Sequence, residues 1–138
     1  MEFEEIRLLK QGETGAVHLV REKGGQDFYI RKILQEPCPI YRELKDCQHP
    51  YLPKFYDVAI TDNTTTILEE YIEGELLSDI ELSEKQAVVL IKELCSVLEC
   101  LHGNGIIHRD IKPSNIMLAK DGHIRLLDFD IARMPRKD

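Results

Sequence analysis

Two short stretches near the end of the chain gather polar side chains that can do chemistry together. The first carries a carboxylate at Asp110, an ammonium group at Lys112 and an amide at Asn115, and a second carboxylate follows at Asp128. A positioned carboxylate can orient or accept the proton of a hydroxyl group. Amide and carboxylate oxygens are ligands that hard divalent cations prefer. The stretches therefore offer one acid–base group and two candidate metal ligands, Asn115 and Asp128.

The spacing of these residues resembles the catalytic and magnesium loops of eukaryotic-like serine/threonine protein kinases, and of the bacterial members in particular. The motif reads His108-Arg109-Asp110-Ile111-Lys112-Pro113-Ser114-Asn115, with Asp128-Phe129-Asp130 beginning eighteen residues after Asp110. The resemblance implies that Asp110 orients the acceptor hydroxyl and that Lys112 approaches the transferred phosphoryl group. It also implies that Asn115 and Asp128 bind Mg²⁺ on the phosphates of ATP. His108 is expected to brace the loop.

An upstream stretch resembles the elements that hold the nucleotide in this family. Gly12 and Gly15 match the last two glycines of a glycine-rich loop, whose backbone N–H groups can approach phosphate oxygens closely. Lys32 follows Gly15 by seventeen residues, the family's interval to the lysine that binds the inner phosphates. Glu43, in a short helix expected over Ile40 to Cys47, is the expected carboxylate partner of Lys32.

The resemblance also implies an adenine site. The backbone groups of Glu70 and Ile72 would read the edge of the ring, while Val17, Ile30 and Met117 would enclose it with apolar surface.

Four residues depart from the family pattern. Lys10 replaces the first glycine of the loop, Ile30 stands where alanine is usual, and Glu69 occupies a position that is more often apolar. Asp130 replaces the glycine of Asp-Phe-Gly, a position where a residue tolerant of positive φ is expected.

The elements that must position these residues can be predicted from hydrophobic periodicity and turn signals. Runs rich in β-branched and aromatic residues predict strands, and apolar residues at three- and four-residue steps after the Ser83 capping box predict a long helix to His102. The predicted strands are Phe3 to Gln11, Ala16 to Glu22, Asp27 to Leu34, Phe55 to Thr61, Thr65 to Ile72, Ile116 to Ala119 and His123 to Leu127.

This order predicts an α+β fold. The resemblance implies one partial kinase domain over residues 1–138, with a small lobe of five antiparallel strands and one helix at 1–72. A hinge at 73–74 and a mainly helical large lobe at 75–138 would follow. The chain ends at Asp138, so the resemblance implies a large lobe truncated after the Asp-Phe-Asp loop.

Composition narrows the function classes. The net charge of −7 argues against a general nucleic-acid surface, and the short basic cluster from Arg133 to Lys137 is expected to be a solvated tail. There is no apolar run of the ~20 residues that cross a bilayer, and the acidic start is unlike a signal peptide. The four cysteines lack C-x-x-C spacing. These features predict a cytoplasmic protein that binds neither nucleic acid nor membrane.

The leading hypothesis is an ATP-binding serine/threonine protein kinase that transfers a phosphoryl group from Mg-ATP to a hydroxyl of a protein substrate. The alternative is a catalytically impaired module that binds nucleotide or a partner, and a small-molecule phosphotransferase is a third option. The apolar surface of the long helix extends beyond one stripe, because it also includes Val88, Val89, Cys95 and Val97. Exposure of this surface would favour association, so we expect a homodimer through the long helix or a fragment of a longer product.

Overall fold

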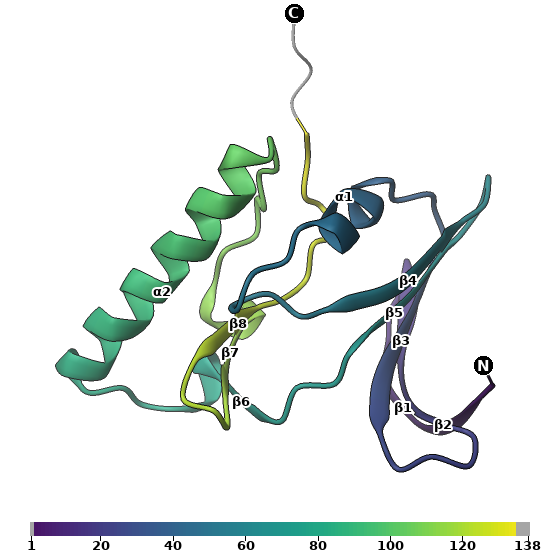
Figure 1. Cartoon of the computed structure of the whole chain (residues 1–138), viewed down its shortest axis with the longest axis horizontal. Coiled ribbons are helices and arrows are strands. Elements are labelled where there is room, and N and C mark those ends of the chain that lie inside the picture. The colour runs from purple at the N-terminus through teal and green to yellow at the C-terminus, as the bar shows by residue number, and fades with distance from the viewer. Residues whose placement is uncertain (1, 135–138) are drawn as a thin grey trace, which may run out of the picture. The chain divides into compact units, whose positions relative to one another are not determined.

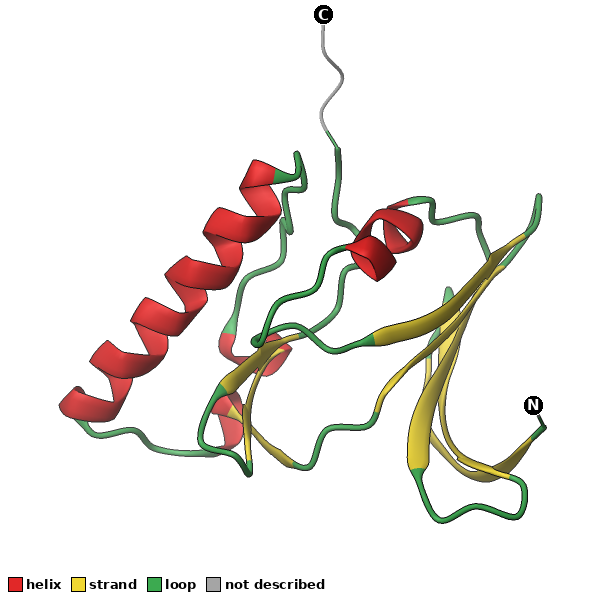
Figure 2. Ribbon diagram, in the orientation of Figure 1, coloured by secondary structure: helices red, strands yellow, loops and turns green. Residues whose placement is uncertain are grey.

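The computed structural model describes residues 2–134, which form two compact units (Figures 1 and 2). The first contains the residues up to Asp46 and Lys54–Tyr71, and the second contains Cys47–Pro53 and the residues from Ile72 onward. The polypeptide therefore enters the second unit briefly at 47–53 before it completes the first.

The first unit is a five-stranded antiparallel sheet with one helix, α1 (Ile40–Asp46), as predicted. The strands are ordered β1-β2-β3-β5-β4, so β3 is central. Their bounds are β1 Phe3–Gln11, β2 Gly15–Glu22, β3 Phe28–Leu34, β4 Phe55–Ile60 and β5 Thr65–Glu70.

Buried side chains of α1 and of the neighbouring strands form the core of this unit. On α1, Ile40, Tyr41 and Leu44 are buried. The buried hydroxyl of Thr65 accepts a bond from the backbone N–H of Cys38 at 2.7 Å and donates to the carbonyl of Glu36 at 2.9 Å. Thr65 therefore fixes the connection between β3 and α1 to the sheet, because both bonds satisfy buried polar groups.

The second unit contains one long helix, α2 (Glu84–Gly103), and a three-stranded sheet of order β6-β7-β8. Ser83 caps α2 in the predicted capping box, in which its hydroxyl accepts from the N–H of Gln86. The strands are β6 Gly74–Leu76, β7 Ile116–Ala119 and β8 Ile124–Leu126, and two 3₁₀ turns lie at Leu77–Asp79 and Pro113–Asn115. No helix within residues 2–134 is long and apolar enough to cross a membrane.

Strand β6 was not predicted from the sequence. Gly74, expected in a hinge, is the first residue of β6 and pairs with Ala119 of β7. A Cβ atom at residue 74 would lie 2.2 Å from the carbonyl oxygen of Leu118, so close pairing of the backbones requires glycine.

A buried carboxylate joins α2 to the hairpin of β7 and β8. Glu93 of α2 is 7% exposed, and its carboxylate accepts bonds from the backbone N–H of Ile124 at 3.0 Å and from Nδ1 of His123 at 2.7 Å. The segment from 47 to 53 packs on the same hairpin, because the N–H of Leu126 donates to the carbonyl of Tyr51 at 3.0 Å. The Tyr51 ring also lies 5.7 Å from that of His123.

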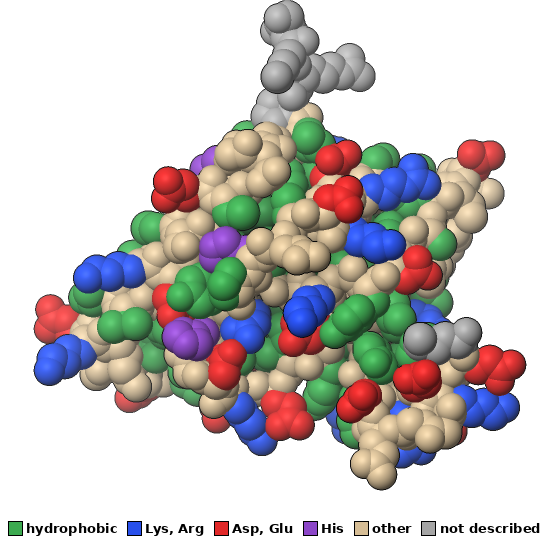
Figure 3. Space-filling model, in the orientation of Figure 1, with side chains coloured by type: hydrophobic (Ala, Val, Ile, Leu, Met, Phe, Trp, Pro, Cys, Tyr) green, Lys and Arg blue, Asp and Glu red, His purple; other side chains and the backbone are tan. Residues whose placement is uncertain are grey.

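The molecular surface mixes charges of both signs. On the face that Figure 3 presents, acidic and basic side chains are interspersed with apolar ones. On α2, Val88, Val89 and Ile91 are about half exposed, while Leu90, Val97 and Leu101 are buried.

We predict that Gly15→Ala destabilises the protein while Gly12→Ala does not. A Cβ at residue 15 would lie 2.5 Å from the carbonyl oxygen of Ile33, whereas one at residue 12 would meet no atom within 4 Å. Overpacking against backbone costs about 1–3 kcal/mol. Urea unfolding of both variants measures the difference, and equal midpoints would contradict the close approach of β2 and β3 at this residue.

We predict that His123 makes stability depend on pH through its bond to Glu93. That bond is the main cause that raises the pKa of His123 above its ordinary value of 6.5. The stabilisation is therefore fully present below pH 6.5 and is lost as pH rises through the folded-state pKa. The free energy of unfolding of the wild type minus that of His123→Asn should therefore fall as the pH rises above 6.5.

The histidine at residue 49 acts in the opposite direction, because burial lowers the pKa of His49. Its protonation opposes folding below pH 6.5, so only the difference between wild type and variant isolates His123. His102→Asn, at an exposed residue of α2, is the matched control. A difference for His123→Asn that is flat with pH would contradict the ion pair with Glu93.

Candidate active site

The loop from His108 to Asn115 is held to the end of β8 by a buried histidine. Nδ1 of His108 accepts from the backbone N–H of Asp110 at 3.0 Å, so Nε2 carries the hydrogen and donates to the carbonyl of Leu127 at 2.7 Å. His108 is 1% exposed, and its ring contacts that of Phe129 edge to face at 4.8 Å. The expected bracing role of His108 is therefore confirmed.

The structure brings Asp110, Lys112 and Asn115 together. Nδ2 of Asn115 donates to the backbone carbonyl of Asp110 at 2.9 Å and to its Oδ2 at 3.0 Å. Nζ of Lys112 lies 3.7 Å from Oδ1 of Asp110, in an ion pair that is partly exposed and therefore weak. Because the nitrogen of the Asn115 amide faces Asp110, its oxygen is the atom that can meet a cation.

Asp128 is joined to this group through the residue before it. The N–H of Leu127 donates to the carbonyl of Asn115 at 2.8 Å, which aligns the strand end that carries Asp128 with the loop from His108 to Asn115. Oδ1 of Asp128 accepts from the N–H of Asp130 at 3.2 Å. The second unit therefore assembles all four polar residues of the two C-terminal motifs.

Left-handed backbone occurs at Arg109 and Asp128, with φ of 76° and 57°. These are the only non-glycine residues with positive φ between residues 2 and 134. Such conformations cost of order 1–3 kcal/mol and cluster at functional sites. Since Asp130 does not have positive φ, its replacement of the family's glycine requires no left-handed backbone in this structure.

The oxygen atoms of Asn115 and Asp128 suit a magnesium ion that is bound together with a nucleotide. They are too few for a metal ion that protein side chains alone would hold. Within residues 2–134, no three His, Cys, Asp or Glu side chains are grouped to hold a metal ion. The expected donors are one amide oxygen, of Asn115, and one carboxylate, of Asp128. Magnesium typically retains several waters and takes one or two carboxylates together with substrate phosphates. These two residues therefore fit Mg²⁺ that arrives with a nucleotide.

In the first unit, three of the predicted nucleotide-binding residues share one face of the sheet. Val17 pairs with Lys32 across β2 and β3, and Ile30 lies two residues before Lys32 on the same face. Arg31 points to the other face, where its guanidinium lies 5.7 Å from the centre of the Phe3 ring. The turn between β1 and β2 is closed by a bond from the N–H of Gly12 to the carbonyl of Gly15 at 2.9 Å.

The expected ion pair between Lys32 and Glu43 does not form in this structure. Glu43 is exposed on α1 and makes no ion pair with any residue between 2 and 134. Nζ of Lys32 instead lies 3.3 Å from the hydroxyl of Tyr41. The physical reason is the rotation of α1, whose buried face presents Tyr41 and not Glu43 to the sheet. The buried positions Ile40, Tyr41 and Leu44 were the signal in the sequence that could have shown this.

The residues expected around adenine belong to different units. Val17, Ile30 and Glu70 are in the first unit, and Ile72 and Met117 are in the second. Glu70 ends β5, where its N–H donates to the carbonyl of Lys54 at 2.8 Å. The joint role of these five residues remains a prediction.

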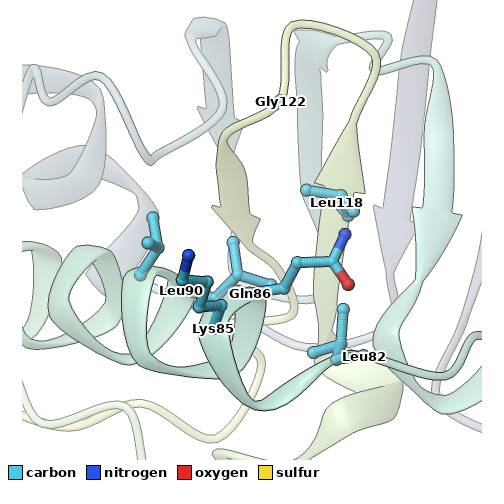
Figure 4. Close-up of a pocket in the computed structure, with 7 residues that line it drawn as sticks. Leu82, Lys85, Gln86, Leu90, Leu118 and Gly122 are labelled. Carbon is cyan, nitrogen blue, oxygen red and sulfur yellow. The ribbon is translucent and has the colours of Figure 1, made fainter.

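Two neighbouring cavities lie beside the first turn of α2, away from the polar residues described above. Their volumes are about 330 and 460 Å³, and both are lined by Leu82, Gln86 and Leu118. Figure 4 shows the smaller cavity between α2 and the hairpin of β7 and β8. Neither cavity is lined by any of the candidate site residues.

Comparison with known proteins agrees with the motifs. Residues 3–138 match the protein kinase domain family, so the chain belongs to the protein kinase family. It is 35% identical to serine/threonine-protein kinase ppk22 of Schizosaccharomyces pombe, over 95% of this chain and 28% of that protein. It is 32% identical to cAMP-dependent protein kinase type 3 of Saccharomyces cerevisiae, over 96% of this chain and 37% of that protein.

A third relative is putative serine/threonine-protein kinase PRKY of Homo sapiens, 33% identical over 88% of this chain and 50% of that protein. The chain thus spans between about a quarter and a half of the length of these three relatives. All three are eukaryotic, and the resemblance to bacterial members remains a prediction.

We predict that Asn115→Asp lowers the free energy of unfolding at neutral pH. The change replaces an amide that donates to Asp110 by a second carboxylate about 3 Å from the first. Loss of these bonds in a buried position costs about 1–3 kcal/mol, and the repulsion should lessen as pH falls and one carboxyl group is protonated.

Urea unfolding at neutral and acidic pH measures this effect, with Ser114→Asp at the exposed neighbouring residue as the control. An Asn115→Asp variant as stable as the control at neutral pH would show that the amide does not organise Asp110.

Proposed function

We propose that this chain binds ATP with Mg²⁺ and transfers the terminal phosphoryl group to a serine or threonine hydroxyl of a protein. The observation that best supports this proposal is the assembly of Asp110, Lys112 and Asn115 with the strand end that carries Asp128. Phosphoryl transfer depends mainly on positioning and on electrostatic stabilisation, which are the functions that such a set of residues can serve.

Each residue then has a distinct function. The carboxylate of Asp110 accepts the hydrogen bond of the acceptor hydroxyl. It takes the proton as the hydroxyl oxygen bonds to the terminal phosphorus of ATP and the bond from that phosphorus to the oxygen of the leaving ADP breaks. The ammonium group of Lys112, in reach of the same carboxylate, attracts the oxygens of the transferred group. Asn115 and Asp128 would hold magnesium, which supplies charge neutralisation on the phosphates. Lys32 and the turn from Gly12 to Gly15 would bind the phosphates from the first unit.

A second candidate function is nucleotide binding without transfer. The exposure of Glu43 favours it, because an ion pair between Lys32 and a carboxylate of α1 is expected in an active kinase of the family.

Homodimer formation through α2 and a cytoplasmic location also remain predictions. The half-exposed side chains Val88, Val89 and Ile91 would supply the apolar surface of such a dimer.

Binding and transfer can be tested separately. Titration of ATP with Mg²⁺ into the wild type should show saturable binding, and Asp128→Asn should weaken it by about tenfold or more because a metal ligand is lost. Asp110→Asn should retain binding and lower the transfer of labelled phosphate to a serine-containing protein by about 10²- to 10⁴-fold. Asp62→Asn, in an exposed turn, is the matched control.

Binding without transfer in the wild type would support the second function. No binding of ATP by the wild type, with or without Mg²⁺, would contradict both.

A further inference from the structure

We propose that Tyr41 is the residue that positions Lys32 for the phosphates of the nucleotide. This inference rests on the proposed function and assigns to Tyr41 the part that the sequence had suggested for Glu43. It depends on contacts within the first unit alone.

The contact between the two side chains is direct and partly buried. The hydroxyl of Tyr41 lies 3.3 Å from Nζ of Lys32, and Nζ lies 5.7 Å from the centre of the aromatic ring. Tyr41 is 2% exposed. An ammonium group near the hydroxyl and within about 6 Å of the ring gains both a charge-assisted hydrogen bond and a cation–π attraction.

Tyr41 is itself held in place, as a positioning residue must be. Its ring packs edge to face on Phe55 of β4 at 5.8 Å. Its backbone N–H donates to the carbonyl of Cys38 at 3.2 Å, and Cys38 is bound in turn to Thr65 of β5. Contacts on two sides therefore fix the hydroxyl relative to the sheet that carries Lys32.

The geometry of α1 excludes Glu43 from the same position. Successive residues of an α-helix are rotated by about 100°, so Glu43 points about 200° away from Tyr41 around the axis. The buried residues Ile40, Tyr41 and Leu44 lie toward the sheet, and Glu43 is exposed. Glu43 cannot reach Lys32 while this face of α1 stays buried.

A fixed partner has a consequence for phosphate binding. The phenol of Tyr41 is neutral, so its hydrogen bond orients the ammonium group of Lys32 without adding a negative charge. Reduced side-chain freedom before binding lowers the cost of association.

The first experiment measures the dissociation constant of Mg-ATP by calorimetry. Tyr41→Phe removes only the hydroxyl and should raise the constant about two- to tenfold, the loss expected for one hydrogen bond. Glu43→Gln should leave it unchanged. In a Lys32→Met background, Tyr41→Phe should have no further effect, because the interaction it removes is already absent.

Two outcomes of this titration would overturn the inference. One is an equal constant for Tyr41→Phe and the wild type. The other is a loss that is as large in the Lys32→Met background, since Tyr41 would then act through the fold. Thermal unfolding of each variant shows whether it is folded.

The second experiment does not depend on nucleotide. Acylation of Lys32 by an amine-reactive reagent, followed by mass spectrometry, should be about two- to tenfold faster in Tyr41→Phe than in the wild type or Glu43→Gln, because the hydrogen bond no longer holds the amine. An unchanged rate would overturn the inference even if ATP binds. If the wild type binds no ATP, the proposed function fails, and the acylation rates still decide whether Tyr41 holds Lys32.

Discussion

The side chain and the backbone carbonyl of Asn115 connect the parts of the candidate active site in the second unit. Its side chain donates two hydrogen bonds to Asp110, and its backbone carbonyl accepts from Leu127, the residue before Asp128. His108 adds a second connection between the same loop and the same strand end. Because these bonds are local and buried or partly buried, the arrangement of Asp110, Asn115 and Asp128 follows from the packing of one hairpin and one loop.

That hairpin is positioned by polar contacts as much as by apolar packing. Glu93 satisfies the backbone N–H of Ile124 and the ring of His123, and Tyr51 binds the backbone of Leu126. A buried donor left unpaired costs about 1–3 kcal/mol, so these bonds specify the register between α2, the hairpin and the segment from 47 to 53. The requirement for glycine at residue 74 is steric, because a Cβ atom there would meet the backbone of Leu118 where β6 pairs with β7. The loop that carries Asp110 is thus supported by residues outside the candidate active site.

Much of the fold could be predicted from the sequence, because its signals are local. Runs rich in β-branched and aromatic residues indicated five strands in the first unit, and the capping box of Ser83 and Gln86 marked the start of α2. Strand β6 could not be found in this way, since three residues carry too little pattern and pair only with the distant β7. The motif also indicated Asp110, Asn115 and Asp128, whose contacts depend on short intervals along the chain.

The prediction that Glu43 is the partner of Lys32 was wrong for a different reason. The family resemblance indicates a carboxylate on α1, and the residue type of Glu43 fits, but residue type does not determine which face of the helix a side chain occupies. The rotation of α1 is set by the burial of Ile40, Tyr41 and Leu44 against the sheet. The same face presents Tyr41, and a buried tyrosine hydroxyl usually needs a polar partner, which here is Lys32.

The central proposal is that Asn115 and Asp128 of the second unit hold the metal ion that arrives with ATP. Paramagnetic broadening by Mn²⁺ in the presence of ATP tests it most directly, with the NMR signals of the side-chain amides as the readout. The account predicts that Mn²⁺ with ATP broadens the signal of the Asn115 amide, and that ATP with Mg²⁺ competes. An Asn115 signal that Mn²⁺ with ATP leaves unchanged would contradict the account.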